Sequence, residues 1–315
     1  MKRYIGEFYL CMAFMLAGSS VVAARYVSDS LGTFTITAIS LGFAVLGLLP
    51  ACIGKLNKSL KGMGLKAWML VCFQALFGIF LFRMFLLNGL LRTTSGEAGI
   101  LTGVTPAATV LIAWVFLKEP LKKADLGGLI CTVSGIFVLQ GILQPSNLLN
   151  SRHIAGNLLV ILAALCESIF NVFSKLSSFK SSQKGNLDPV VQTFLVSGAA
   201  LVLCLIPMYR ENPVKSLTAI GIGQWLALVW YGLFVTALAF IFWYAGIKRS
   251  KITVAAAFSG MMPLTSLVLS VIILGERPGW QQWIGGLLIV SGMLLAGTRD
   301  AVSERPEVNA EDVRI

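Results

Sequence analysis

Long apolar stretches recur along the whole chain, separated by short segments that hold most of the charged residues. Each stretch is about 17 to 24 residues long, and a helix rising about 1.5 Å per residue needs about 20 residues to cross about 30 Å of hydrocarbon. The pattern predicts ten membrane-spanning helices, near residues 5–24, 34–53, 68–91, 98–117, 126–143, 154–173, 190–208, 225–247, 252–274 and 280–296. The expected fold class is an all-α integral membrane protein.

Composition agrees with this expectation. Of the 315 residues, 57% are hydrophobic and 12% are charged, whereas about a quarter of the residues of a soluble domain are charged. The longest polar stretches of the sequence are residues 174–189 and the tail at residues 298–315. Because no soluble domain fits between the spans, function is expected inside the helix bundle.

Two parts of the sequence match each other without a gap. At an offset of 157 positions, three pairs of identical residues coincide: Gly103 with Gly260, Pro106 with Pro263 and Glu119 with Glu276. Further glycines match at the same offset in the spans on either side. The chain is therefore predicted to hold two repeats of five spans each.

The basic residues indicate how the repeats are placed. With the amino terminus taken as cytoplasmic, 18 of the 25 Lys and Arg fall on the inner side, 6 on the outer side and Arg83 inside a span. By the positive-inside rule both termini are cytoplasmic, and we expect a multi-pass protein of the cell membrane. The inner loop after the fourth span holds Lys118, Lys122 and Lys123, but their counterparts after the ninth span are uncharged. Five spans per unit turn the second unit upside down, which explains the lost charges and predicts an inverted-topology duplication.

The duplication divides the chain into a first repeat at residues 1–143, an external linker at 144–153, a second repeat at 154–297 and a cytoplasmic tail at 298–315. The first span resembles a signal peptide, with Lys2 and Arg3 ahead of an apolar run. Shifted by 150 positions, however, it matches the sixth span, with Gly6 on Gly156. We expect it to remain in the mature protein as a structural helix.

Several function classes lack the residues they require. The six cysteines lie within or at the ends of apolar spans without a CxxC pair, so no disulfide, metal site or cofactor is predicted. The net charge of +11 is scattered over many loops, which does not favour a nucleic-acid partner. There is one histidine, His153, and no HExxH, GxSxG or phosphate-binding glycine motif. No catalytic residue is predicted, and this chain alone is not an ATP-driven pump.

The paired motif in the fourth and ninth spans is a "TP" or "MP" followed thirteen residues later by a Glu and then by Pro120 or by Arg277 and Pro278. With five helices per half, it resembles the EamA group of the drug/metabolite transporter superfamily. The resemblance covers roughly residues 6–297 and implies a substrate cavity between two four-helix groups, with the fifth and tenth helices at the periphery. It also implies export or exchange of small metabolites. An Arg often found in the second helix of that group appears here as Ser40.

Glu167 is the first candidate for a substrate or proton site, because it lies inside the sixth span. A carboxylate costs about 2.5 to 3.5 kcal/mol in the middle of a membrane, so Glu167 is expected to face the bundle interior or a wet cavity. Asn171 and Ser174 follow on the same helix face. The alternative is a structural carboxylate held by hydrogen bonds.

Arg83 is the second candidate, as an anion-binding group in the third span. Helical rise places it about 22 Å from the inner end and Glu167 about 10 Å from that end, a gap of about 12 Å. Glu97, near the outer end of the fourth span, is therefore the better-matched partner in depth. A structural pair or a snorkelling side chain is the alternative for Arg83.

The remaining candidate residues are expected to shape the helices or to line the substrate path. Pro106 and Pro263 are expected to interrupt their helices and to serve as gating kinks, while Gly103 and Gly260 offer small faces for close packing. Glu119 and Glu276 are predicted to be structural, at the start of the next helix. In the eighth span, Trp243 and Tyr244 are candidates for contact with substrate.

Taken together, the sequence predicts a secondary-active transporter that moves amino acids, amines or drug-like compounds by alternating access. Export is the expected direction, and protons are a potential coupling ion through Glu167. Its partners are a small-molecule substrate and the lipid bilayer, and it is expected to be a monomer or a homodimer. An intramembrane enzyme and a passive channel are the alternatives, but inverted repeats within one chain are typical of alternating access.

Overall fold

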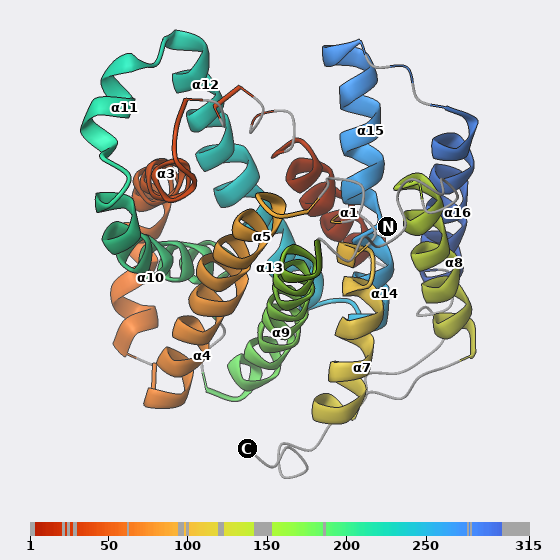
Figure 1. Ribbon diagram of the computed structural model, residues 1–315. Coiled ribbons are helices and arrows are strands. Elements are labelled where there is room, and N and C mark those ends of the chain that lie inside the picture. Colours follow the sequence, from red (N-terminus) through yellow and green to blue (C-terminus); the bar gives the residue numbers. More distant parts are fainter. Residues whose placement is uncertain are drawn as a thin grey trace.

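The protein is a bundle of helices (Figure 1). The computed structural model describes residues 4–20, 23, 26–27, 30–61, 63–93, 98, 101–118, 123–141, 153–184, 187–275, 277 and 279–297. No strand occurs among these residues. The all-α prediction is confirmed for the part of the chain that the structure describes.

The helices up to residue 141 are long and apolar, and one contains a wide turn. They are α1 (Ile5–Gly18), α3 (Thr33–Lys61), α4 (Leu65–Ala75), the π-helical η2 (Leu76–Leu81), α5 (Phe82–Leu90), α7 (Thr105–Leu117) and α8 (Lys123–Leu139). The segments α4, η2 and α5 follow one another without a break and form one membrane-length span.

The helices from residue 154 onwards complete the bundle. They are α9 (Ile154–Lys184), α10 (Pro189–Tyr209), α11 (Pro213–Ala219), α12 (Ile222–Trp230), the π-helical η5 (Tyr231–Leu238), α13 (Ala239–Ile247), α14 (Ile252–Phe258), α15 (Met261–Leu274) and α16 (Trp280–Gly297). The span α12–η5–α13 is again continuous through its π-helical part. At the offset of 157, η2 falls on residues 233–238, which lie within η5.

Among the described residues, six helical stretches are long and apolar enough to cross a membrane, and four shorter apolar helices accompany them. The shorter ones are Ile5–Gly18, Thr105–Leu117, Asp125–Leu139 and Trp280–Ala296. The protein is therefore a helical membrane protein by length and composition of its spans.

The sixth span extends further than predicted. Its end was expected near residue 173, before the polar piece at residues 174–189, but α9 continues to Lys184. The first turn past residue 173 is packed rather than solvated, because Ser174, Lys175 and Leu176 are all buried. A polar sequence therefore stays helical here, since tertiary contacts stabilise it. The short helix α11 was not predicted.

Two pairs of helices stand at opposite edges of the bundle in Figure 1, with α8 and α16 on one side and α3 and α10 on the other. The α8–α16 pair is close because glycines meet: a Cβ on Gly128 would lie 2.8 Å from the Gly292 carbonyl oxygen, and a Cβ on Gly135 would lie 2.8 Å from that of Gly285. These four glycines match each other at the offset of 157. Each helix thus presents the same two positions to its partner, in reverse order.

Contacts between other helices follow the same correspondence. A Cβ on Gly89 of α5 would press on Val160 of α9, and a Cβ on Gly246 of α13 would press on Leu10 of α1. Gly89 and Gly246 are 157 positions apart, and Leu10 and Val160 are 150 positions apart. Matched positions therefore make matched contacts at two separate places in the bundle.

Burial changes abruptly halfway along the ninth predicted span. Six of the seven residues of α14 are buried, all but Phe258. Beyond the break at Ser259 and Gly260, no residue from 261 to 273 in α15 is buried. In Figure 1, α15 extends away from the other helices at the top of the molecule, whereas α14 lies among them. The α14 half of this span is therefore enclosed by other helices, whereas the α15 half is only partly covered.

Candidate functional site

Glu167 points into the bundle and is still accessible. Its helix α9 exposes one face, with Leu158 57%, Ile161 41% and Leu165 39% exposed. With about 3.6 residues per turn, Glu167 lies on the side opposite to these residues. Since its side chain is only half-buried, its accessible surface must belong to the interior of the bundle.

The immediate partner of Glu167 is the start of another helix. The Thr105 hydroxyl lies beside the Glu167 carboxylate, and Thr105 is the first residue of α7. A helix N-terminus carries about half a positive charge and unpaired N–H groups, which favour a carboxylate nearby. The structure thus gives this intramembrane acid a polar surrounding without an ion pair to another described residue.

Further hydrogen bonds join α9 to α7 around this point. The Ser168 hydroxyl donates to the Thr105 carbonyl oxygen at 3.2 Å, and the Asn171 side-chain amide donates to the Thr109 hydroxyl at 3.3 Å. Both donors are buried. The expected polar stripe on α9 therefore meets hydroxyl residues of α7, and Asn171 is held by protein.

Helix breaks precede both prolines that the sequence singled out. The backbone of the fourth predicted span forms a turn at residues 103–104, and Pro106 is then at the first turn of α7. The ninth span turns at residues 259–260, before Pro263 in α15. Gly103 and Gly260 are buried at these turns, and a Cβ on Gly260 would press on Thr132 of α8 and Ile289 of α16.

Arg83 reaches from α5 towards α3 and η5. Its guanidinium donates to the Thr37 hydroxyl at 2.9 Å and lies over the ring of Tyr231, 4.8 Å from the ring centroid. Thr37 in turn donates to the Thr33 carbonyl oxygen. Arg83 is half-buried, and no described carboxylate lies within ion-pair distance of it. Glu97, the partner expected from depth, lies outside the described residues.

The depth estimate for Arg83 and Glu167 was wrong. Gly89 lies level with the turn of α9 from Gly156 to Val160, and α5 and α9 run antiparallel. Arg83, six residues before Gly89 on α5, therefore lies level with a point about two to three residues before Glu167, a gap of about 4 Å. The estimate failed because the two depths were measured from opposite ends of helices longer than the assumed 30 Å.

Trp243 and Tyr244 lie in the core of the bundle. Trp243 is 6% exposed and Tyr244 is not exposed at all. The Trp243 ring packs edge-on against Phe14 and stacks on Phe170, while the Tyr244 hydroxyl lies beside Ser174. Neither side chain has an open face in this structure, which favours a packing role over contact with substrate.

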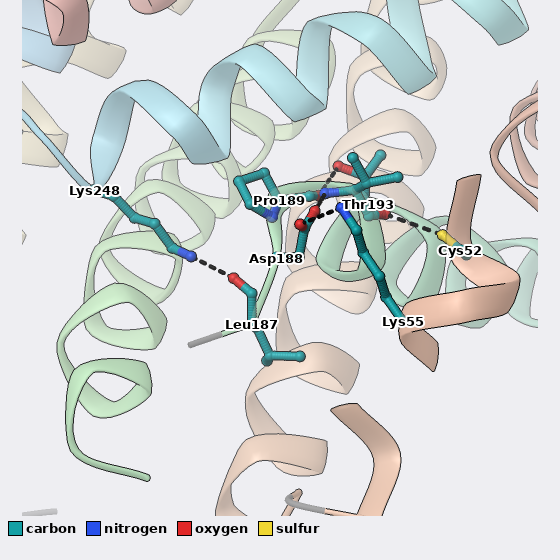
Figure 2. Close-up of polar contacts among 8 residues, drawn as sticks. Cys52, Lys55, Leu187, Asp188, Pro189, Thr193 and Lys248 are labelled. Carbon is teal, nitrogen blue, oxygen red and sulfur yellow. Dashed lines mark hydrogen bonds and ion pairs between the residues drawn. The ribbon is translucent and has the colours of Figure 1, made fainter. Parts of the chain in front are cut away.

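A second polar cluster lies where α3, α10 and α13 end or begin (Figure 2). The Lys55 ammonium is 2.7 Å from the Asp188 carboxylate, and Asp188 also accepts from the Val190 amide as the N-cap of α10. The Lys248 ammonium donates to the Leu187 carbonyl oxygen. This cluster ties three helices together at one end of the bundle.

Neighbouring charges and burial shift the pKa values of Asp188 and Lys248 in opposite directions; both residues lie outside the membrane spans. Burial alone would raise the pKa of Asp188, but the hydrogen bond from Lys55, the Val190 amide and the charges of Lys55 and Lys248 outweigh it and lower the pKa. Burial lowers the pKa of the Lys248 ammonium, against the effect of Asp188. Asp188 is thus held in its ionised form.

The other end of the α3–α10 pair is tied by a different carboxylate. Glu211, just past α10, accepts from the Phe34 and Thr35 amides at 3.1 and 2.8 Å and from the Thr35 hydroxyl at 2.7 Å. It satisfies the first turn of α3, where N–H groups have no partner within the helix. The α3–α10 pair is therefore fastened at both ends.

Sequence reasoning missed Thr37, Tyr231, Asp188 and Glu211. The pair Asp188 and Pro189 is a recognisable helix start, an N-cap residue followed by Pro. Nothing in the sequence marks the other three residues, because their roles depend on which helices pack together. Glu119 and Glu276, predicted to be structural, lie outside the described residues.

Comparisons with known proteins agree on one family. A family model described as "EamA-like transporter family" matches residues 4–140 and 154–298. The uncharacterized transporter YetK of Bacillus subtilis is 27% identical to this chain over 93% of it and 87% of YetK. The aromatic amino acid exporter YddG of Ancylobacter novellus is 25% identical over 90% of this chain and 93% of YddG. A solved crystal structure shares the fold: the match covers 93% of this chain and 96% of the chain in that structure, with a TM-score of 0.73 and 22% sequence identity.

Proposed function

Because the chain belongs to the EamA-like transporter family, we propose that it carries small organic solutes across the cell membrane by alternating access between two inverted five-helix repeats. Family and relatives indicate a transporter rather than an enzyme. Relatives named as amino acid exporters make amino acids and their amine derivatives the first substrates to test. Export is the direction we propose, with both termini on the cytoplasmic side.

The proposed inverted repeat is supported by the reciprocal glycine contact between α8 and α16. Gly128 meets Gly292 and Gly135 meets Gly285, so each position meets the counterpart of the other. A two-fold relation between the two helices produces contacts of this reciprocal kind, which supports the proposal. A two-fold axis in the membrane plane relates inverted repeats, and it lets one sequence pattern build two opposite-facing conformations of similar energy.

Glu167 is the group that we propose for proton or cation coupling. It lies inside a membrane span, it is accessible from the bundle interior, and it has no cationic partner among the described residues. Intramembrane acids with these properties usually serve ion or proton pathways. The helix breaks before Pro106 and Pro263 supply places where the two central spans can bend during the cycle.

The test is substrate-driven proton movement in proteoliposomes that contain the purified protein and a pH-sensitive dye. Amino acids and cationic amines are screened with wild type, Glu167→Gln and the control Glu7→Gln, which removes a carboxylate in the first turn of α1. We expect proton flux with at least one substrate in wild type and Glu7→Gln, and none in Glu167→Gln. Substrate flux that is unchanged in Glu167→Gln would leave uniport or exchange instead of coupling. No flux of any tested solute would count against transport of this class.

A further inference from the structure

We propose that Arg83, supported by Thr37 and Tyr231, binds the carboxylate of the transported solute. This inference rests on the proposed transport function and names the chemical class of its substrate. The proposed ligand is a small carboxylic acid or amino acid with an apolar side chain.

Unused hydrogen-bond donors are the first argument. A guanidinium has five N–H donors and no acceptor, and among the described residues Arg83 makes one hydrogen bond, to Thr37. The ring of Tyr231 lies 4.8 Å from the guanidinium carbon and contributes a cation–π contact, not a conventional hydrogen-bond acceptor. Arg83 is half-buried, so part of its side chain is open to a solute or water.

The second argument is that no carboxylate among the described residues pairs with Arg83. An arginine inside a membrane span costs several kcal/mol unless it is paired or hydrated. The carboxylate that packs on the first turn of α3, Glu211, uses its two oxygens on Phe34 and Thr35 and lies beyond ion-pair distance of Arg83. Glu167 lies at a similar depth but does not form an ion pair with Arg83 either. A bound anion is therefore the group that completes the site.

Geometry favours a carboxylate with an apolar side chain. The planar fork of an arginine matches the two oxygens of a carboxylate better than a point charge does. One turn away from Arg83 and Thr37 on their own helices, the rings of Phe80 and Phe34 lie 5.9 Å apart, and both are half-buried. This aromatic pair gives the anion site an apolar neighbour, which suits the side chain of such a solute.

The test measures binding and transport with matched probes. L-phenylalanine, phenethylamine, which lacks the carboxylate, and phenylalaninamide, in which it is neutral, are titrated into the purified protein by calorimetry. The variants are Arg83→Gln and Arg83→Lys. The control Arg249→Gln removes an arginine that also lies over a tyrosine ring, Tyr9, but donates to a backbone carbonyl. A monodisperse elution profile confirms that each variant is folded.

We expect phenylalanine to bind wild type and Arg249→Gln alike, at least about tenfold more weakly in Arg83→Gln, and at an intermediate level in Arg83→Lys. Phenethylamine should show no such dependence on Arg83. Equal binding of phenylalanine to wild type and Arg83→Gln overturns the inference, as does tighter binding of phenethylamine or phenylalaninamide than of phenylalanine. Arg83-dependent binding of phenylalanine without flux in liposomes would refute the proposed transport and leave the carboxylate site intact. Flux of amines alone would support transport and refute the carboxylate site.

Discussion

Gly135 of α8 and Gly285 of α16 lie so close that a Cβ on either one would come within 2.8 Å of the other's backbone. A larger residue must therefore push the two helices apart. Overpacking of this kind costs about 1 to 3 kcal/mol, and more where the neighbour is backbone that cannot rotate away.

We predict that Gly135→Val lowers the thermal unfolding temperature of the detergent-purified protein. Gly127→Val is the matched control, because Gly127 lies on the same helix with open space around its missing Cβ. Both changes alter helix propensity equally, so the difference between the two melting temperatures reports the helix contact alone. Identical melting temperatures would mean that α8 and α16 do not meet at these glycines.

The proposed orientation predicts which side each exposed lysine occupies. Lys61, at the end of α3, should face the cytoplasm, and Lys215, in α11, should face outwards; both are exposed. Single cysteines at these positions are tested with a membrane-impermeant maleimide on intact cells. Lys215→Cys should be labelled at once and Lys61→Cys only after the cells are opened. The opposite pattern would reverse the proposed topology.

Asp188 predicts a pH dependence of stability. Its folded-state pKa is lowered from 3.8, so the ionised group stabilises the fold at neutral pH, and this contribution is lost as the pH falls below about 4. The exposed pair with Lys55 contributes little, because solvent screens it. Asp188→Asn keeps a cap acceptor and loses the charge, so it should be slightly less stable than wild type at pH 7 and equal to it near pH 3. A difference that grows on acidification would contradict the assignment.

We expect loss of the Lys175 ammonium to lower stability more than loss of the Asp188 charge, because Lys175 is buried. It donates to the Ile247 carbonyl oxygen at 3.1 Å and to that of Ser250, at the end of α13. Hydrogen bonds from a charged donor are worth about 1.5 to 3 kcal/mol each, and a cation at a helix C-terminus is favourable. Lys175→Met should therefore lower the melting temperature by several degrees, whereas Lys66→Met, at an exposed site on α4, should not.

The spans themselves were predictable from sequence, because hydrocarbon thickness fixes their length and every described span falls where apolar residues cluster. The breaks before Pro106 and Pro263 were predictable as well, since proline removes a backbone donor. The π-helical parts η2 and η5 were not, because nothing in their apolar sequences distinguishes a wide turn from an ordinary one.

The candidate site was only half predictable. Glu167 and Arg83 stand out because charge inside a span is costly. Their partners Thr105, Thr37 and Tyr231 lie on other helices, and only the rotation and depth of each helix decide which residues meet. The 12 Å gap estimated for the two charges shows how an assumed membrane thickness fails when helices extend past it.

The uneven packing of the ninth predicted span has a mechanical consequence. The helix α14 is enclosed by its neighbours, whereas α15, beyond Ser259 and Gly260, is only partly covered and packs on α1 at Gly18. The fourteen residues of α15 extend about 21 Å, so a rotation of about 10° at the break displaces the far end by about 4 Å. A small change of angle at the break is thus magnified at the far end of α15.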